Sequence, residues 1–371
     1  MSTIETTPTA IVFGAGASCA EGAPLQGSLF RDYFTLQQAQ ASNVHHDWDR
    51  ELATFFSDFF GINVDHGNLT ATRFPTFEEV LGVVEIAESQ GESFRDWGTS
   101  HLVTGAHKPR LQHVRDLLIL LIAQVLDKKL GDGPAIHHNK LLAKLGPAIR
   151  HTTFISFNYD LLLDNALVDL HRTWDLDYAI NFSNYSEDDG WHRPRADRSA
   201  LLLKLHGSLN WLYCTTCRSV TLTPKEKGVC RLKWEPETCI CSACETLAVP
   251  IVIPPTYLKA LSNLHLRQIW DAAERALLSI DRIIFCGYSF PDADIHVRYL
   301  LKRTELNRKR ATPLEVFVVN EHAGKTDAAR DSERDRYERF FVDKQRVHWT
   351  SLSFEEFAAN PSLVGDRTCW R

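Results

Sequence analysis

The sequence predicts an α/β fold with a Rossmann-type parallel sheet, a helical insertion and a small four-cysteine module. Three observations support this prediction. Short apolar runs typical of buried strands recur along the chain and end in small or polar residues. Residues 31–145 have helical periodicity and little else. Six of the nine cysteines lie between positions 214 and 244, and such clustering in a cytosolic protein indicates metal binding rather than disulfides.

These features divide the chain into three parts. We expect the Rossmann-type core to comprise residues 1–30, 146–213 and 245–371, the helical insertion residues 31–145, and a zinc-ribbon-like module residues 214–244. The chain has 371 residues, which is longer than a typical single domain, so more than one unit is expected.

Composition disfavours several classes of protein. The net charge of -6 at pH 7 argues against a surface that coats nucleic acid. Residues 1–10 have neither the basic nor the apolar region of a secretory signal. The most apolar run, residues 117–126, is too short to span a membrane. We therefore expect a soluble, cytoplasmic protein that binds neither membranes nor nucleic acid directly.

The first strand signal, residues 11–13, runs directly into the turn GAGAS at positions 14–18. A strand that enters small residues ahead of a helix leaves backbone N–H groups free to hold an anion. The dinucleotide fingerprint is incomplete, because Cys19 stands where its third glycine would be. A phosphate site and an ordinary β–α turn therefore both stay open.

The insertion is predicted to be a set of packed helices. Phenylalanines at positions 55, 56, 59 and 60 form one aromatic helix face, and the leucine-rich segment that contains residues 117–126 is predicted to end near Gly131. Such stripes more often belong to a core than to a ligand site.

Four further segments are predicted strands, at residues 152–160, 201–205, 281–287 and 314–319. They end in or lead into Asn158-Tyr159-Asp160, His206-Gly207-Ser208, Gly287-Tyr288-Ser289 and Asn320, respectively. Each of these ends alone is explained as a cap or a turn. Ligands bind at the carboxyl ends of strands in open parallel sheets, so the set together favours one shared site.

Three of these polar residues have side chains suited to chemistry. Asn158 and Asp160 are two positions apart, so both side chains can face one ligand and bind a carboxamide or a water. Alternatively, Asp160 caps the helix that follows. His206 can act as a general base near neutral pH, or it can be a hydrogen-bonded structural histidine.

The cysteines form two pairs with the spacing of a zinc site. The first pair is Cys214 and Cys217, the second is Cys241 and Cys244, and 23 residues separate them. Four thiolates leave no open coordination position, so the zinc would be structural, with a decayed or redox site as the alternative. Cys230 and Cys239 also lie in this region and leave the choice of ligands open.

In chain order, GAGAS, FNYD, KLHGS, the paired CxxC motifs, GYS and VVN resemble the sirtuin superfamily. The resemblance runs from Thr9 to about Asn320 and is interrupted by the helical insertion. The sequence GYSFPDAD at 287–294 is also similar to the sirtuin-like NAD hydrolases of bacterial anti-phage defence systems.

The resemblance implies a site for NAD and a structural zinc. Asn158 would order the water or ribose beside the scissile bond, Asp160 would bind the nicotinamide carboxamide, and His206 would be the base. Contacts to the pyrophosphate side of NAD are implied for Gly14, Ala15, Gly16 and Ser18. Contacts to phosphate and the adenosine ribose are implied for Gly287, Ser289 and Asn320. The implied zinc ligands are Cys214, Cys217, Cys241 and Cys244.

Two departures from the deacylating sirtuins guide the expected activity. The GIPDFR-like stretch of deacylases is replaced by GAPLQGSLFRD at 22–32, and their FGE-like segment is replaced by IVIPPTYLK at 251–259. We therefore expect an NAD glycohydrolase that yields nicotinamide and ADP-ribose. The alternatives are an NAD-dependent protein deacylase and a non-catalytic subunit that senses NAD or ADP-ribose.

The resemblance to defence proteins also implies a role and partners. The expected role is an anti-phage effector that depletes NAD when it is activated. A homo-oligomer and a partner such as a HerA-like ATPase are implied, with residues 31–145 as the candidate docking segment. The alternative is that the apolar faces of this segment belong to the internal core.

Overall fold

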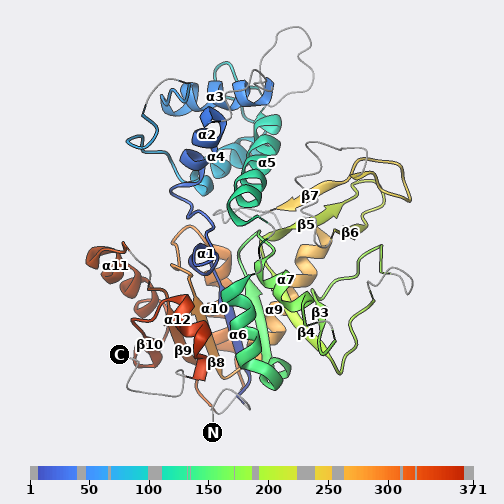
Figure 1. Cartoon of the computed structure of the whole chain (residues 1–371), viewed down its shortest axis with the longest axis vertical. Helices are drawn as coiled ribbons and strands as arrows, with labels where there is room; N and C mark the ends of the chain where they lie inside the picture. The colour runs from blue at the N-terminus through green and yellow to red at the C-terminus, as the bar shows by residue number, and fades with distance from the viewer. Residues whose placement is uncertain are drawn as a thin grey trace. The chain divides into compact units, whose positions relative to one another are not determined.

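The chain divides into two compact units, one formed by residues 1–23 and 132–371 and the other by residues 24–131 (Figure 1). The computed structural model describes residues 7–39, 47–65, 68–98, 111–131, 133, 135–170, 172–185, 192–223, 239–252, 263–309, 312–321 and 324–362. No helix within these ranges is long and apolar enough to cross a membrane.

The first unit is built on a seven-stranded parallel sheet with the order β10-β9-β8-β1-β2-β4-β3. The strands are β1 (Thr9–Phe13), β2 (Thr152–Ser156), β3 (Asp175–Asp177), β4 (Ser199–Lys204), β8 (Arg282–Cys286), β9 (Glu315–Val319) and β10 (Val347–Trp349). The parallel α/β sheet predicted from the sequence is confirmed. Strand β1 lies between β2 and β8, and the strand order runs in opposite directions on its two sides, which creates the switch point at which α/β folds bind ligands.

Burial explains why these short runs form strands. All five residues of β1 are buried, as are the last four of β8 and of β9. A parallel strand that is covered on both faces needs a continuous apolar run rather than an alternating one. Apolar residues with high β propensity, such as Ile11, Val12 and Ile284, meet that need.

Helices cover both faces of this sheet. The helices of the first unit are α1 (Ala15–Cys19), α6 (Ile136–Leu145), α7 (Leu162–Val168), α9 (Leu264–Ser279), α10 (Ile295–Asn307), α11 (Asp327–Glu338) and α12 (Phe354–Ala359). Helix α6 packs against α12 and α7, and α9 packs against α10 and β4. The connection from β1 to β2 crosses the sheet in one direction, and the connection from β8 to β9 crosses it in the other. Because such connections are right-handed, α6 and α10 lie on opposite faces of the sheet (Figure 1).

The second unit contains the helices α2 (Leu29–Ala39), α3 (Asp47–Phe60), α4 (Phe77–Gln90) and α5 (Leu111–Leu130). Its core is aromatic: Phe55 and Phe56 are fully buried, and the Phe56 ring lies 4.7 Å from that of Phe30. The predicted aromatic face of α3 is therefore a core face. Helix α5 ends at Leu130, directly before Gly131, near which its end was predicted. Helix α6, which the sequence analysis placed in the insertion, belongs to the first unit.

A separate three-stranded antiparallel sheet has the order β6-β5-β7. Its strands are β5 (Gly207–Tyr213), β6 (Val220–Leu222) and β7 (Val249–Val252). Strand β5 therefore does not extend the parallel sheet, although the sequence analysis assigned residues 207–213 to the Rossmann-type core. The reason is that the chain turns at Leu205 and His206 and then pairs with β7.

The carboxylate of Glu21 caps helix α6. It accepts hydrogen bonds from the backbone N–H groups of Ile136, His137 and His138 at 3.1, 2.6 and 3.1 Å, and His138 Nδ1 lies 3.1 Å away. Burial raises the pKa of Glu21, but the hydrogen bonds from His138 and His137 outweigh it and hold the pKa below its ordinary value. A negative charge at a helix N-terminus is also favoured by the helix dipole.

We predict that Glu21→Gln lowers the free energy of unfolding by about 1–3 kcal/mol at pH 7, because a charged acceptor is lost. The depressed pKa of Glu21 contributes stability above the unfolded pKa of about 4.3 and loses it as the pH falls through the folded value. The difference between variant and parent should therefore shrink below about pH 4. Urea unfolding at pH 7 and at lower pH measures this, with Glu338→Gln as a surface control. An equal loss at both pH values would contradict the assignment.

Candidate functional site

The loops that follow five parallel strands meet at one edge of the sheet. The last residues of these strands are paired in register: Phe13 with Ser156 and Cys286, Ser156 with Lys204, and Cys286 with Val319. Backbone hydrogen bonds continue between neighbouring strands at this edge, from Gly14 N to Cys286 O at 2.9 Å and from Gly287 N to Val319 O at 2.9 Å. Most of the residues predicted for the site lie in these loops.

The glycines of the first loop contact the loop after β8. Gly16 N donates to Gly287 O at 2.8 Å. A Cβ atom on Gly14 would lie 2.6 Å from Gly287 O, and one on Gly16 would lie 2.8 Å from Gly287 Cα. These glycines are therefore required by the close approach of two backbone segments, in addition to any role in binding a phosphate. Ala15, between them, is half-buried in α1.

Ser18, Asp160 and Asn158 form one hydrogen-bonded network. Ser18 Oγ donates to Asp160 Oδ2 at 2.6 Å and accepts from Asn158 Nδ2 at 2.8 Å. Asn158 Nδ2 also donates to Gly14 O at 2.9 Å. Ser18 and Asp160 are buried, whereas Asn158 is half-buried. The amide nitrogen of Asn158 is thus committed to the chain, and its amide oxygen is the atom that it can offer to a ligand.

Asp160 also contacts the start of the helix that follows it. Its Oδ1 accepts from Leu162 N, the first residue of α7, at 3.1 Å. The N-cap residue of α7 is Leu161, so Asp160 is not itself the cap; one of its carboxylate oxygens binds the first helical N–H and the other binds Ser18.

His206 is 2% exposed and lies two positions after the end of β4. Its ring centroid lies 5.2 Å from that of Phe157, and its Nε2 lies 3.7 Å from Asp294 Oδ2. Asp294 is 1% exposed and accepts a hydrogen bond from the Tyr288 hydroxyl at 2.9 Å. A histidine beside a buried carboxylate is held in orientation and is stabilised when it takes up a proton.

Sequence reasoning missed Asp294 as a site residue. It is the last residue of the stretch GYSFPDAD at 287–294, and its membership of that motif was the sequence signal that could have identified it. The loop itself is fixed from outside: Arg298 Nη2 donates to Phe290 O at 2.8 Å, and the Tyr337 hydroxyl donates to Tyr288 O at 2.7 Å. The side chain of Ser289 is exposed, and the backbone carbonyl oxygen of Ser289 accepts a hydrogen bond from Arg336.

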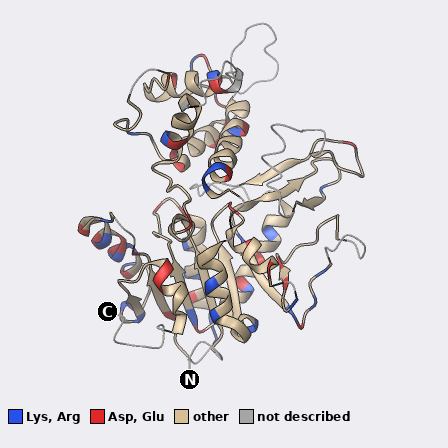
Figure 2. Ribbon diagram, in the orientation of Figure 1, with Lys and Arg blue, Asp and Glu red and all other residues tan. Residues whose placement is uncertain are grey.

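Asn320 lies at the edge of a cavity of about 520 Å³. Its Nδ2 donates to Glu333 Oε1 at 2.6 Å, and Glu333 forms an ion pair with Lys325 at 2.7 Å. Trp349 and residues of α11 line the same cavity. Acidic and basic side chains both occur along α11, so the two signs of charge are mixed beside the cavity (Figure 2).

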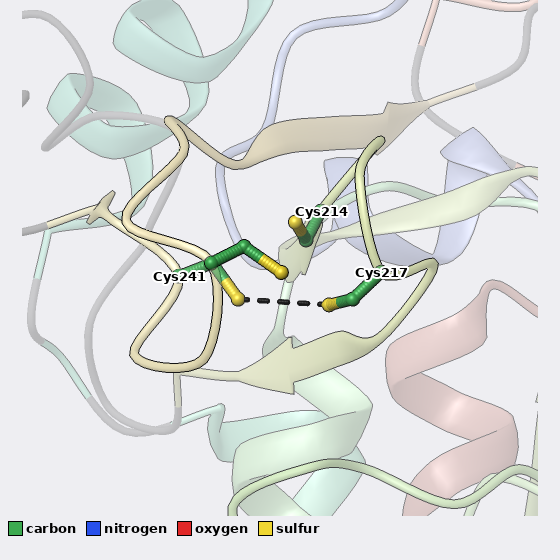
Figure 3. Close-up of side chains that lie close together, drawn as sticks. Cys214, Cys217 and Cys241 are labelled. Atoms are coloured by element: carbon green, nitrogen blue, oxygen red, sulfur yellow. Dashed lines mark hydrogen bonds between the residues drawn. The ribbon is translucent and has the colours of Figure 1, made fainter.

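The four predicted zinc ligands lie together, two in the loop between β5 and β6 and two in the segment before β7. The sulfur atoms of Cys214, Cys217, Cys241 and Cys244 are all within 4.8 Å of one another. Cys217 Sγ and Cys241 Sγ are 3.7 Å apart, and Cys214 lies beside this pair (Figure 3). This cluster can hold a metal ion, and four thiolates at this separation fit tetrahedral zinc.

Cys239, one of the two other cysteines of the region, is not part of this cluster. Cys239 is buried and packs with Leu212 and Ala248 in an apolar cluster. Cys230 lies outside the described residues. The ambiguity left by the sequence is therefore resolved for Cys239, which has a packing role.

Electrostatics also favour a cation at the cluster. Hydrogen bonds from Ser219 lower the pKa of Cys217 to about 6, while the hydrogen bond with Cys217 raises the pKa of Cys244 to about 12. The backbone N–H of Ala243 also lowers the pKa of Cys241, so two of the four thiols ionise more readily than a free cysteine. A divalent cation would stabilise all the thiolates that bind it.

We predict that the purified protein contains about one zinc ion per chain and that Cys217→Ser/Cys241→Ser removes it. Cys239→Ala is the matched control and should retain the metal, since that thiol packs in an apolar cluster. Atomic emission spectroscopy measures the metal content. A double variant that still held one zinc ion per chain would contradict this ligand set.

We predict that Gly287→Ala lowers the free energy of unfolding by at least about 3 kcal/mol, because strain and a backbone clash add together. The φ angle of Gly287 is +65°, and a Cβ there would lie 2.0 Å from Ala17 N. Gly324→Ala is the matched control, because Gly324 has a φ of +84° and nothing within 4 Å of its Cβ position. Equal losses in the two variants, measured by urea unfolding, would show that the loop contact is unimportant.

Comparison with known proteins places the chain. The model of the SIR2-like domain matches residues 152–342. Among solved structures, Sir2Tm bound to a propionylated peptide aligns over 98% of this chain and 95% of its own, with 14% identity and a TM-score of 0.44. A complex of a Sir2 homologue with NAD aligns over 99% and 93%, with 13% identity and a TM-score of 0.47.

No curated protein sequence matches the chain. The family match nevertheless covers more than half of the 371 residues and contains β2, β4, β8 and β9 with the loops that follow them. The chain therefore belongs to the SIR2-like domain family.

Proposed function

We propose that the protein is an NAD glycohydrolase that cleaves NAD to nicotinamide and ADP-ribose. The observation that carries this proposal is the buried pair of His206 and Asp294 at the same sheet edge as the network of Ser18, Asn158 and Asp160. Membership of the SIR2-like family supports NAD as the ligand of this edge.

NAD would extend along the strand ends. We assign the nicotinamide end to Asn158 and Asp160, whose oxygen atoms can accept hydrogen bonds from the carboxamide. The pyrophosphate would lie by the turn that contains Gly14, Ala15, Gly16 and Ser18, and by Gly287 and Ser289. The cavity of about 520 Å³ beside Asn320 has room for the adenosine end.

The proposed reaction breaks the bond between C1′ of the ribose and the nicotinamide nitrogen. The bonding electron pair leaves with nicotinamide, and the ribose develops oxocarbenium character. Water then forms the new bond to C1′, and His206 accepts its proton. The carboxylate of Asp294 stabilises the imidazolium that forms, because the two groups are buried and 3.7 Å apart. The products are ADP-ribose, nicotinamide and one proton.

The proposal that water, rather than the acyl group of a peptide, forms the new bond to C1′ rests on the sequence. The stretches at 22–32 and 251–259 both depart from the deacylase pattern. Residues 253–259 of the second stretch lie outside the described structure. A protein deacylase would use the same nicotinamide site but would need an acyl-lysine peptide, and a sensing subunit would bind NAD without cleaving it.

We further propose that the protein is an anti-phage effector whose NAD hydrolysis is held off until activation. The similarity of residues 287–294 to sirtuin-like defence hydrolases supports this role. A homo-oligomer or a HerA-like ATPase would provide the control, with the helical unit as the docking part. Exposed apolar side chains of that unit, Val83, Ile86 and Phe94, support a contact surface there.

We predict that the purified chain, alone or with its natural partner added, releases nicotinamide and ADP-ribose from NAD without any peptide, as measured by chromatography. Asn158→Ala and His206→Ala should each lower this rate at least about 100-fold, because each removes a group that acts on the reacting atoms. His113→Ala is the control, since His113 lies in the second unit and pairs with Glu51. All variants should melt within a few degrees of the parent.

Three outcomes would decide among the candidate functions. Turnover only with an acetyl-lysine peptide, together with an O-acyl product, would identify a deacylase. Stoichiometric NAD binding without nicotinamide release, also after addition of the natural partner, would identify a sensor. Full activity in both Asn158→Ala and His206→Ala would contradict the proposed mechanism.

A further inference from the structure

We propose that Lys204 is a positioning residue that, together with Asp164, holds the Asn158–Asp160 loop in the geometry needed for NAD cleavage. Lys204 is the last residue of β4, two positions before His206, and it is 0% exposed. A lysine is almost never buried to this degree unless it is paired, because removing an ammonium group from water is costly. The inference rests on the function proposed above, since this loop is the proposed nicotinamide site.

The ammonium group of Lys204 has two acceptors. Its Nζ lies 2.9 Å from Asp164 Oδ2 and 2.5 Å from the backbone oxygen of Asp160. The side chain of Asp164 is only 4% exposed, so both ions of the pair are buried. The carboxylate balances the charge, and the second hydrogen bond connects Lys204 to the loop after β2.

Asp164 is itself held in place. The Tyr178 hydroxyl donates to Asp164 Oδ1 at 2.5 Å, and Asn210 Nδ2 donates to the Tyr178 oxygen at 3.3 Å. Burial and the negative charge of Asp164 raise the pKa of Tyr178 well above its ordinary value, so the phenol stays protonated and keeps donating. The resulting chain of hydrogen bonds links β4, α7 and β5.

The same loop is held from its other side by the turn after β1. Asp160 Oδ2 accepts from Ser18, and Ser18 accepts from Asn158. Lys204 therefore contacts the backbone of the loop at Asp160, next to the hydrogen bond from Leu209 N to Tyr159 O at 3.1 Å, while Ser18 holds the side chains of the loop. Only one residue separates Lys204 from His206 along the chain. The side chain that contacts the proposed nicotinamide site at Asp160 is therefore close in sequence to the proposed base.

Stability alone does not explain a buried pair of this kind. Replacing a buried ion pair by uncharged residues of similar volume is often neutral or stabilising, because desolvation offsets the attraction between the charges. A role in orienting the loop explains why one hydrogen bond goes to the carbonyl of Asp160 and not only to a carboxylate.

The test is the double variant Lys204→Met/Asp164→Asn, which removes both charges and keeps an oxygen acceptor for Tyr178. We expect kcat for nicotinamide release to fall at least about tenfold and KM for NAD to change less than about threefold, because orientation at the reacting bond is lost while the adenosine end is unaffected. The backbone amide of Leu162, bonded to Asp160, should exchange hydrogen faster. Thermal unfolding checks that the fold is retained.

The matched control is Lys302→Met/Glu305→Gln. Lys302 Nζ also donates to a carboxylate, that of Glu305, and to a backbone oxygen, that of Phe340, but it lies on α10. This variant should leave kcat and the exchange of the Leu162 amide unchanged.

A double variant at Lys204 and Asp164 with kcat within about twofold of the parent and unchanged amide exchange would overturn the inference. If the parent released no nicotinamide, also after addition of the natural partner, the proposed function would fail, and the exchange of the Leu162 amide would still decide whether Lys204 positions the loop. If the double variant did not fold, Tyr178→Phe would replace it, because it removes only the hydroxyl that holds Asp164. Faster amide exchange in Tyr178→Phe would support the inference, and unchanged exchange would overturn it.

Discussion

The close approach of the loops after β1 and β8 is the constraint on which the rest of the candidate site depends. Gly16 and Gly287 have no side chains, so their backbones come within hydrogen-bond distance, 2.8 Å from N to O. This contact fixes α1, and α1 carries Ser18 to Asp160 and Asn158, residues that lie more than 130 positions further along the chain. Main-chain packing therefore positions the side chains of the candidate site.

Buried charge is concentrated at the same edge of the sheet, and each buried charge described above has a partner. Lys204 is paired with Asp164, Lys325 with Glu333, and His206 lies beside Asp294. Such pairs contribute little net stability, because desolvation offsets their attraction. Their placement at strand ends is better explained by the need for polar groups with fixed orientation, which a preorganised site requires.

Strand β5 connects the proposed base, His206, to the four-cysteine cluster. It begins at Gly207, directly after His206, and ends at Tyr213, directly before Cys214. The four-cysteine cluster therefore lies at one end of a strand whose other end follows the proposed base. A metal bound by the cysteines would anchor the far end of β5, and pairing with β6 and β7 holds the strand between the two ends.

The sequence by itself determined the parallel strands, the helical character of the second unit and the two cysteine pairs, because each depends on apolar periodicity or on local spacing. It also indicated that Gly14, Asn158, His206 and Asn320 follow strands, which places them at one edge of any parallel sheet. Only the tertiary structure decided that Asp294 lies beside His206, that Lys204 reaches Asp160, that Glu21 caps α6, and that Cys239 packs in a core. These contacts join segments that are distant in sequence or depend on which way a side chain points, and local periodicity carries no information about either.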